Sequence, residues 1–201
     1  MDLVVDNLGV ARGGVTVLEG VSFRLAPGAA LVLRGANGIG KTTLLRCLAG
    51  LQPAISGTVT GPELAYGAHA DGLKAMLTVG ENLAFWASVY GGRVGDALTA
   101  MNLVALVDRR AADLSAGQKR RLGLARMMVT GRQVWLLDEP TVSLDTASVG
   151  LFQAMLRAHL GQGGSAVIAT HIDLGVPAAV LDLSGFRAVQ RSDGAFDGAF
   201  L

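Results

Sequence analysis

The segment between residues 35 and 42 constrains the fold more than any other part of the chain. It reads Gly35-Ala36-Asn37-Gly38-Ile39-Gly40-Lys41-Thr42, which fits the phosphate-binding pattern Gly-x4-Gly-Lys-Ser/Thr. Residues 29–33 before it form an apolar run that predicts a strand buried on both faces. Residues 42–49 after it carry apolar side chains at a helical period that stops at Gly50. A strand, a glycine-rich loop and a helix in this order indicate an α/β fold with an anion site at the loop.

Each residue type in this loop suits the binding of phosphates. Glycines let the backbone wrap so that its N–H groups face the β- and γ-phosphates, and the helix directs its positive end toward them. We expect Lys41 to add a catalytic point charge and Thr42 to act as a magnesium ligand. The residues expected to contact the nucleotide here are Gly35, Ala36, Asn37, Gly38, Ile39, Gly40, Lys41, Thr42 and Thr43.

A second run combines a strand with two acidic residues. Residues 133–137 predict a buried strand, and Asp138, Glu139 and Pro140 follow it directly. In open α/β sheets, ligands bind outside the carboxyl ends of the strands. Asp138 is placed there to hold magnesium through water, and Glu139 to polarise an attacking water. The alternative is an acidic strand end followed by a proline stop, which the phosphate-binding loop makes less favourable.

The remaining pattern predicts strands and helices that alternate around a helical insertion. Strands separated by helices mean a mainly parallel sheet covered on both faces. Residues 71–130 form the insertion, between core segments 1–70 and 131–201. The expected strands are 2–5, 21–25, 29–33, 63–67, 133–137 and 165–170, and the expected helices are 42–49, 78–90, 94–107, 115–130 and 146–160.

Composition and charge exclude several classes of protein. Hydrophobic residues make up 51% of the 201 residues and charged ones 16%, which excludes a disordered chain. A net charge of +1 gives no footprint for nucleic acid. The single cysteine, Cys47, excludes an internal disulfide. No signal peptide and no apolar stretch of roughly 20 residues is found, so we expect a protein in the cytosol or docked on a membrane complex.

The segment Leu114-Ser115-Ala116-Gly117-Gln118 adds a third motif. Ser115 and Gln118 predict a capped helix start. Capping leaves Gly117 unexplained, because glycine in a first turn costs helix stability unless the backbone approaches a ligand. With the phosphate-binding loop before it and Asp-Glu-Pro after it, the order resembles the ATP-binding subunits of ABC transporters over almost the whole chain.

This resemblance implies a single ABC ATPase domain over residues 1–201. Its fold would be α/β: a P-loop NTPase (RecA-like) core with a mainly parallel sheet, an N-terminal antiparallel β region and a small helical insertion that carries the signature motif. ATP and Mg²⁺ would be the cofactors. Two copies would form a head-to-tail dimer, with each ATP held between the loop of one copy and the signature of the other. The residues carried over are Ser115, Gly117 and Gln118 in the signature, Asp145 in the D-loop Ser143-Leu144-Asp145, and the switch histidine His171.

Two positions depart from the family pattern. Residues 10–14 offer no aromatic side chain to stack on adenine; Arg12 could stack its guanidinium there, or could equally be a solvated loop charge. His69 stands where the family has the Q-loop glutamine. Magnesium prefers oxygen ligands, so we expect His69 to act through a bridging water. Alternatively, His69 is only a loop residue under the docking surface.

Residues 69–74, 77–79 and 81–86 narrow the resemblance to the ATP-binding subunits of bacterial haem exporters used in cytochrome c maturation. The implied partners are integral membrane subunits (CcmB/CcmC-like), with this chain peripheral on the cytoplasmic side of the inner membrane. No nucleic-acid partner and no direct haem contact are expected, since Cys47 stands alone and no Cys-x-x-Cys-His is present. The alternatives are another small ABC exporter or a soluble non-transport ABC ATPase.

Overall fold

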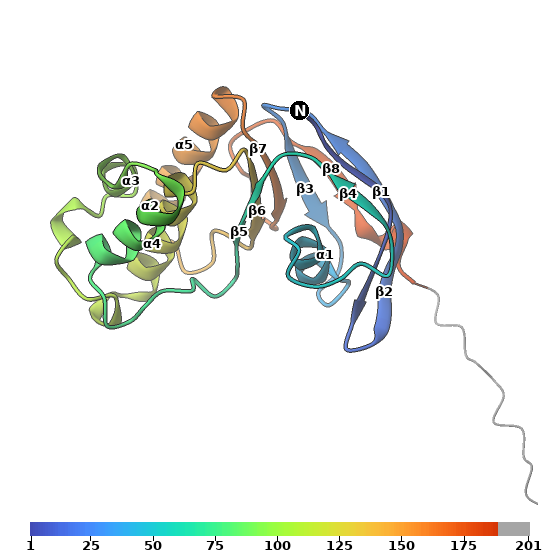
Figure 1. The fold of residues 1–201 in the computed structure, drawn as a ribbon, viewed down its shortest axis with the longest axis horizontal. Helices are drawn as coiled ribbons and strands as arrows, with labels where there is room; N and C mark the ends of the chain where they lie inside the picture. Colours follow the sequence, from blue (N-terminus) through green and yellow to red (C-terminus); the bar gives the residue numbers. More distant parts are fainter. Residues whose placement is uncertain (189–201) are drawn as a thin grey trace, which may run out of the picture.

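The protein, described here over residues 1–188 of a computed structural model, contains two β-sheets and five α-helices. Figure 1 shows α1 between the two sheets and the other helices on the far side of the parallel sheet. The helices are α1 (Lys41–Leu48), α2 (Val79–Tyr90), α3 (Val94–Ala100), α4 (Ala116–Val129) and α5 (Thr146–Gly161). Three short 3-10 helices cover Val104–Leu106, Ala111–Asp113 and Leu183–Phe186. Within the described residues, no helix is long and apolar enough to cross a lipid bilayer.

The first sheet has three antiparallel strands in the order β2-β1-β4. They are β1 (Leu3–Arg12), β2 (Val15–Leu25) and β4 (Ser56–Thr60). Gly13 and Gly14 join β1 to β2, and both have positive φ (59° and 82°), the backbone that a two-residue hairpin turn requires. This sheet confirms the predicted antiparallel region at the N-terminus.

The second sheet has five strands in the order β5-β6-β7-β3-β8, and every pairing in it is parallel. Its strands are β3 (Ala30–Arg34), β5 (Leu64–Gly67), β6 (Val134–Asp138), β7 (Ser165–Ala169) and β8 (Ala179–Asp182). The predicted α/β fold with a mainly parallel sheet is therefore confirmed. The predicted core segment 131–201 extends beyond residue 188, and that part lies outside the described residues.

Alternate residues of the central strands point into two different cores. In β6, Val134 and Leu136 pack with α1 and the antiparallel sheet, whereas Trp135 and Leu137 pack with α2 to α5. This alternation follows from the two-residue period of a strand. Because both faces are buried, β6 is apolar up to its last residue, Asp138, as the sequence indicated.

Two helix starts and one helix end agree with the sequence in detail. Thr78 with Glu81, and Ser115 with Gln118, form reciprocal capping boxes at α2 and α4. Helix α1 ends where Gly50 adopts a φ of 70°. The predicted caps are therefore confirmed.

Five elements differ from the sequence prediction. The helix expected over residues 94–107 ends at Ala100, because Asn102 takes a φ of 49° and Leu103 N–H donates to the carbonyl of Leu98, a helix-ending geometry. Strands β1 and β2 run well beyond residues 2–5 and 21–25. Bulges interrupt their pairing and so break the alternation by which a strand is read from sequence. Strands β4 and β8 were not predicted, since both are short and largely exposed.

Candidate active site

The phosphate-binding loop connects the end of β3 to the start of α1. Gly35, Gly38 and Gly40 have φ values of 137°, 81° and 122°, a backbone region that favours glycine. A β-carbon on Gly35 would also lie 3.1 Å from the Ile39 side chain, and one on Gly40 would lie 3.1 Å from Leu18. The glycines therefore permit both the turn of the loop and its close packing.

Lys41 is the first residue of α1, and its side chain is 9% exposed. Its Nζ donates a hydrogen bond to the carbonyl oxygen of Gly35 at 2.8 Å, and a longer one to that of Ala36 at 3.4 Å. The ammonium is thereby held against the loop that precedes it. A phosphate in the loop would meet both this positive charge and the N-terminus of α1.

A cavity of about 250 Å³ brings the loop to the two acidic residues at the end of β6. Thr42 is exposed there, while Asp138 is 3% exposed. The neighbouring parallel strands end at one edge of the sheet, so segments far apart in the sequence meet at this cavity. Its lining residues are Arg12, Asn37, Gly38, Gly40, Lys41, Thr42, Thr43, Asp138 and Glu139.

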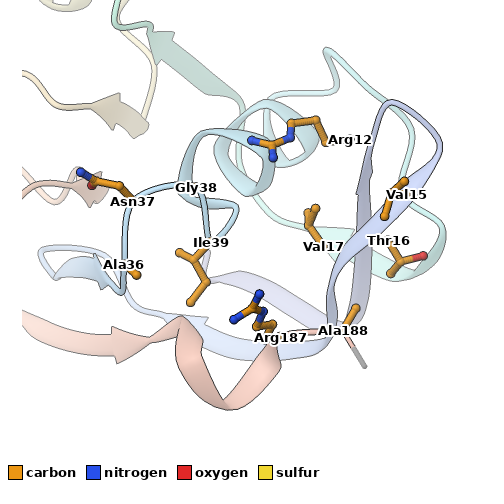
Figure 2. Close-up of a pocket in the computed structure, with 10 residues that line it drawn as sticks. All are labelled: Arg12, Val15, Thr16, Val17, Ala36, Asn37, Gly38, Ile39, Arg187 and Ala188. Carbon is orange, nitrogen blue, oxygen red and sulfur yellow. The ribbon is translucent and has the colours of Figure 1, made fainter. Parts of the chain in front are cut away.

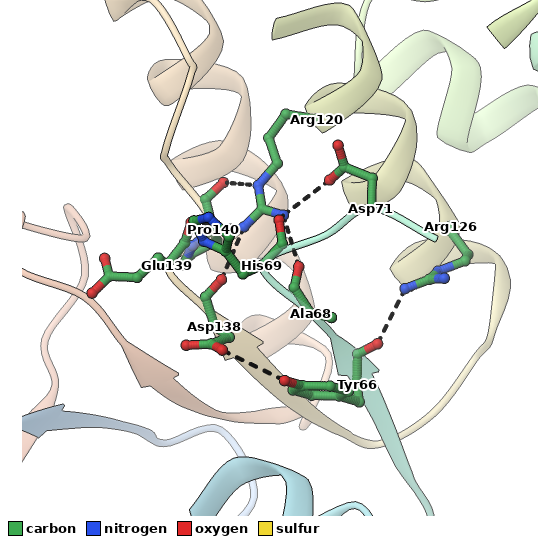
Figure 3. A network of polar contacts seen from close by, with 9 residues as sticks. All are labelled: Tyr66, Ala68, His69, Asp71, Arg120, Arg126, Asp138, Glu139 and Pro140. Atoms are coloured by element: carbon green, nitrogen blue, oxygen red, sulfur yellow. Dashed lines mark hydrogen bonds and ion pairs between the residues drawn. The ribbon is translucent and has the colours of Figure 1, made fainter. Parts of the chain in front are cut away.

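Tyr66 adds a contact to Asp138 that the sequence did not indicate. It lies on β5 beside β6, and its hydroxyl donates to Asp138 Oδ2 at 3.5 Å (Figure 3). Burial, followed by the negative charge of Asp138, raises the pKa of Tyr66 to about 12. The hydroxyl therefore stays protonated at neutral pH and remains a donor to the carboxylate.

Glu139 and His171 come together at the ends of β6 and β7. His171 Nε2 lies 3.6 Å from Glu139 Oε1, and the carboxylate is the less exposed of the two side chains, at 25% against 55%. Glu139 has a φ of 47°, which is rare for a residue with a side chain, and its N–H donates to Ala169 at 2.8 Å. The Glu139 side chain, which lines the cavity, thus lies beside the imidazole of His171.

A larger cavity of about 620 Å³ adjoins the first and shares Arg12, Asn37 and Gly38 with it. In the view of Figure 2, Arg12 and Arg187 lie on opposite sides of this cavity, with Val17 and Ile39 between them. No sequence motif marked Arg187, because its position depends on a contact distant in sequence. It forms a β-bridge with Leu18, and the next residue, Ala188, donates from its N–H to Val17 at 3.1 Å. The other lining residues are Val15, Thr16, Ala36 and Ala188.

The signature segment lies elsewhere in the chain's fold. Within residues 1–188, Ser115, Gly117, Gln118 and Asp145 line neither cavity. Ser115 accepts from the Gln118 N–H at 3.3 Å, and the Gln118 side chain accepts from the Ser115 N–H at 2.9 Å. One copy of the chain therefore does not bring the signature to the phosphate-binding loop.

Packing explains why a glycine stands at position 117, an explanation that the sequence did not suggest. A β-carbon at this residue would lie 3.0 Å from the carbonyl oxygen of Ser143. Asp145, in the same loop as Ser143, caps α5 by accepting from the Ser148 N–H at 2.8 Å. Hydrogen bonding by the Ser148 side chain, followed by that of the Ser148 N–H, lowers the pKa of Asp145. The close approach of α4 to a backbone carbonyl therefore favours glycine at this position, with or without a ligand.

His69 lies in the exposed loop after β5. Its carbonyl oxygen accepts a hydrogen bond from Arg120 at 3.2 Å. Among residues 1–188, the hydrogen bond found at His69 is made by its backbone carbonyl, and none is found for its imidazole.

The fold and these motifs define a class of protein, and comparison with known proteins agrees. Residues 18–142 match the family model described as ABC transporter, so the chain belongs to the ABC transporter family. This family membership confirms the resemblance to ABC transporter ATP-binding subunits that the sequence motifs indicated.

Within that family the chain is CcmA-like. It is 67% identical over 192 residues to the cytochrome c biogenesis ATP-binding export protein CcmA of Cereibacter sphaeroides, covering 94% of this chain and 91% of that one. It is 60% identical over 204 residues to the protein of the same name from Ruegeria pomeroyi, with both chains covered in full. A solved structure from Pyrococcus furiosus, described as an ABC transporter ATP-binding protein, superposes with a TM-score of 0.83. It covers 94% of this chain and 100% of its own at 23% identity, and so supports the fold alone.

Proposed function

We propose that this chain hydrolyses ATP to power the haem exporter complex used in cytochrome c maturation. The observation that carries the proposal is the cavity where the phosphate-binding loop faces Asp138 and Glu139, with His171 beside Glu139. The CcmA relatives, named for export in cytochrome c biogenesis, support the pathway. Another small ABC exporter is the alternative.

The two adjoining cavities divide the ATP molecule between them. The loop residues and Lys41 bind the β- and γ-phosphates, and the larger cavity takes the adenosine. Arg12 and Arg187 offer flat guanidinium groups, which stack on nucleobases. Their position on either side of the cavity supports a stacking role for one or both.

Magnesium fits the residues present. Mg²⁺ is commonly held by one or two carboxylates together with substrate phosphates and water. Asp138 and the exposed hydroxyl of Thr42 both line the phosphate cavity, and they are the residues we propose for this role. Among the described residues no group of three or more His, Cys, Asp or Glu forms a complete metal site, as expected if phosphates supply the other ligands. The bound ion would neutralise charge on the phosphates.

Hydrolysis then requires an activated water. Glu139 polarises the water that attacks the γ-phosphate, and His171 orients that water and the γ-phosphate. Lys41 stabilises the charge that develops on the phosphate oxygens. The 3.6 Å separation of Glu139 and His171 supports their joint action on one water molecule.

A second copy of the chain completes the site. Because the signature residues Ser115, Gly117 and Gln118, and Asp145 in the D-loop, lie away from the loop of their own copy, we propose that they act on the ATP of a head-to-tail partner. Membrane subunits would hold the two copies near one another and so raise their effective concentration. The chain purified alone should therefore be mostly monomeric, with ATPase activity that rises with protein concentration. Full activity in dilute monomer would contradict this dimer.

Residues 71–130 act as the helical subdomain of a single ABC ATPase domain. The cleft between this subdomain and the core is the proposed docking site for membrane subunits of the CcmB/CcmC type. This cleft, of about 280 Å³, lies between the core and α2 and α4, and includes Leu51, Trp86 and Tyr90. Leu51 and Tyr90 are exposed apolar side chains, as is Val89 on the same helix. Docking there would place the chain peripherally on the cytoplasmic side of the inner membrane, with recognition of haem left to the membrane subunits.

The test is reconstitution of the chain with its membrane subunits in vesicles, followed by assays of ATP hydrolysis and haem delivery. Wild type should hydrolyse ATP and deliver haem in an ATP-dependent manner, and Lys41→Ala should lose both. Hydrolysis without any haem-dependent step would favour another exported substrate. A complex that binds no nucleotide would refute the proposal.

A further inference from the structure

The side chain of Arg120 binds the backbone at the end of β6, where the two acidic residues of the candidate active site lie. It lies on α4 and is 6% exposed. Its Nε donates to the carbonyl of Pro140 at 3.0 Å, and its Nη2 donates to those of Asp138 and Glu139 at 3.0 and 2.6 Å. Figure 3 shows one guanidinium facing these three successive carbonyls. The backbone that carries the two acidic residues is therefore held by a single side chain.

The same guanidinium holds the loop after β5. Nη1 donates to the carbonyls of Ala68 and His69 at 2.8 and 3.2 Å, and to Asp71 Oδ1 at 2.9 Å. A buried charge is costly unless it is paired, and Asp71 supplies the opposite charge. Gly123, also on α4, admits this carboxylate, since a β-carbon there would lie 2.8 Å from Asp71 Oδ1. The helix, the loop and the strand end thus meet at Arg120.

The backbone of Glu139 needs such support. A residue with a side chain at a φ of 47° persists only where its surroundings over-determine it. On one side the Glu139 N–H is bound to Ala169 at 2.8 Å, and on the other side its carbonyl is bound to Arg120. The Glu139 side chain extends from this doubly bound backbone toward His171. Releasing the carbonyl would let the backbone relax and move the carboxylate.

We propose that Arg120 is a positioning residue for ATP hydrolysis, which fixes residues 138–140 so that the Glu139 carboxylate faces the phosphate cavity. This inference rests on the function proposed above. Arginine suits the role because its five N–H donors lie in one plane and reach several acceptors, whereas lysine offers three donors from one atom. Asp71 acts with it by balancing the charge. The guanidinium does not line the phosphate cavity, so it acts through the residues that it holds, chiefly Glu139.

The test compares Arg120→Gln and Arg120→Lys in the full chain, assembled with its membrane subunits. Displacing a reacting group by about 1 Å can cost on the order of 100-fold in rate. We expect kcat to fall by about 30-fold in Arg120→Gln, with KM for ATP and the Kd of a fluorescent ATP analogue within about threefold of wild type. Arg120→Lys should recover only part of the rate.

Val129→Ala is the control, because it removes buried methyl groups from the same helix away from the site. At a matched loss of melting temperature it should keep kcat within about twofold.

A double-mutant comparison separates positioning from general loss of stability. If Arg120 acts through Glu139, adding Arg120→Gln to Glu139→Gln should lower the single-turnover rate by less than about twofold. A further 30-fold loss in that background, or an unchanged kcat in Arg120→Gln alone, would overturn the inference. Should Arg120→Gln not fold, Asp71→Asn takes its place, with an expected fall in kcat of about fivefold and the same criteria. Absence of ATPase activity in wild type would refute the proposed function instead.

Discussion

The imidazole of His171 lies 3.6 Å from the carboxylate of Glu139, although the two residues follow different strands. Strands β6 and β7 are parallel neighbours, so their carboxyl ends deliver both side chains to one edge of the sheet. The sheet thus brings both side chains to one edge, and contacts made after the strands set the direction in which each side chain points.

Replacing Glu139 by glutamine should separate nucleotide binding from turnover. The amide keeps the shape of the side chain and loses the group that polarises water. We expect ATP binding close to wild type and a turnover at least about 100-fold lower, with nucleotide-bound dimers accumulating. Glu19→Gln, at an exposed position on β2, is the matched control and should leave turnover unchanged. Hydrolysis by Glu139→Gln within a few-fold of wild type, at saturating magnesium, would contradict the assignment.

Removing the Arg187 side chain should weaken nucleotide binding. If its guanidinium stacks on the base, Arg187→Ala should raise the Kd for ATP by about tenfold and leave kcat at saturation nearly unchanged. Stacking does not read the edge of a base, so GTP should be affected to the same degree. Isothermal titration with both nucleotides measures this.

Two comparisons interpret the Arg187 result. Arg12→Ala distinguishes a second stacking residue from a solvated loop charge, because only the former should also weaken binding. Arg24→Ala, an exposed arginine paired with Asp2, serves as the control. Equal affinities in wild type and Arg187→Ala would show that the base is held by other residues.

Acid should destabilise the fold through His159. This residue stacks on Trp135 with ring centroids 3.7 Å apart, and burial lowers its pKa below the ordinary 6.5. Below pH 6.5 the unfolded chain therefore binds more protons at this position than the folded protein does. The free energy of unfolding must then decrease as pH falls from 6.5 through the lower folded pKa.

His159→Phe keeps a stacked ring and removes the titration. We expect its melting temperature to change less than that of wild type between about pH 7 and about pH 5. Differential scanning calorimetry in matched buffers measures the two slopes. Parallel slopes would assign the acid sensitivity to other groups.

Substitutions at His69 should separate ATP hydrolysis from transport. If the imidazole acts through a bridging water, His69→Gln should retain ATPase activity, because the amide offers a similar acceptor. His69→Ala should hydrolyse ATP with less transport per ATP. Measurements on the assembled complex decide between this role and that of a simple loop residue. Identical ATPase rates and identical transport per ATP in all three proteins would remove His69 from the mechanism.

Local patterns carried most of what could be predicted. The loop at residues 35–42 is one contiguous segment, and so is the acidic pair Asp138-Glu139 at the end of β6. The placement of each at a sheet edge could therefore be predicted from the strand and helix that flank it. The positions of Arg187, Tyr66 and Arg120 depend on pairing between distant strands and on helix packing, which no local pattern encodes. The irregular strands were missed because bulges disturb the two-residue period, and residues 94–107 were misread because an asparagine can end a helix as glycine does.

The position of β3 in its sheet determines when the phosphate-binding loop can become functional during synthesis. Strands β1, β2 and β4 all come from the first 60 residues and can pair early. Strand β3, in contrast, has as its two neighbours β7 and β8, which the ribosome makes much later. Pairing between strands distant in sequence is slow, and nascent chains fold from the N-terminus. A partly made chain therefore exposes an unpaired apolar strand and cannot yet consume ATP, so this stage is where chaperone binding should concentrate.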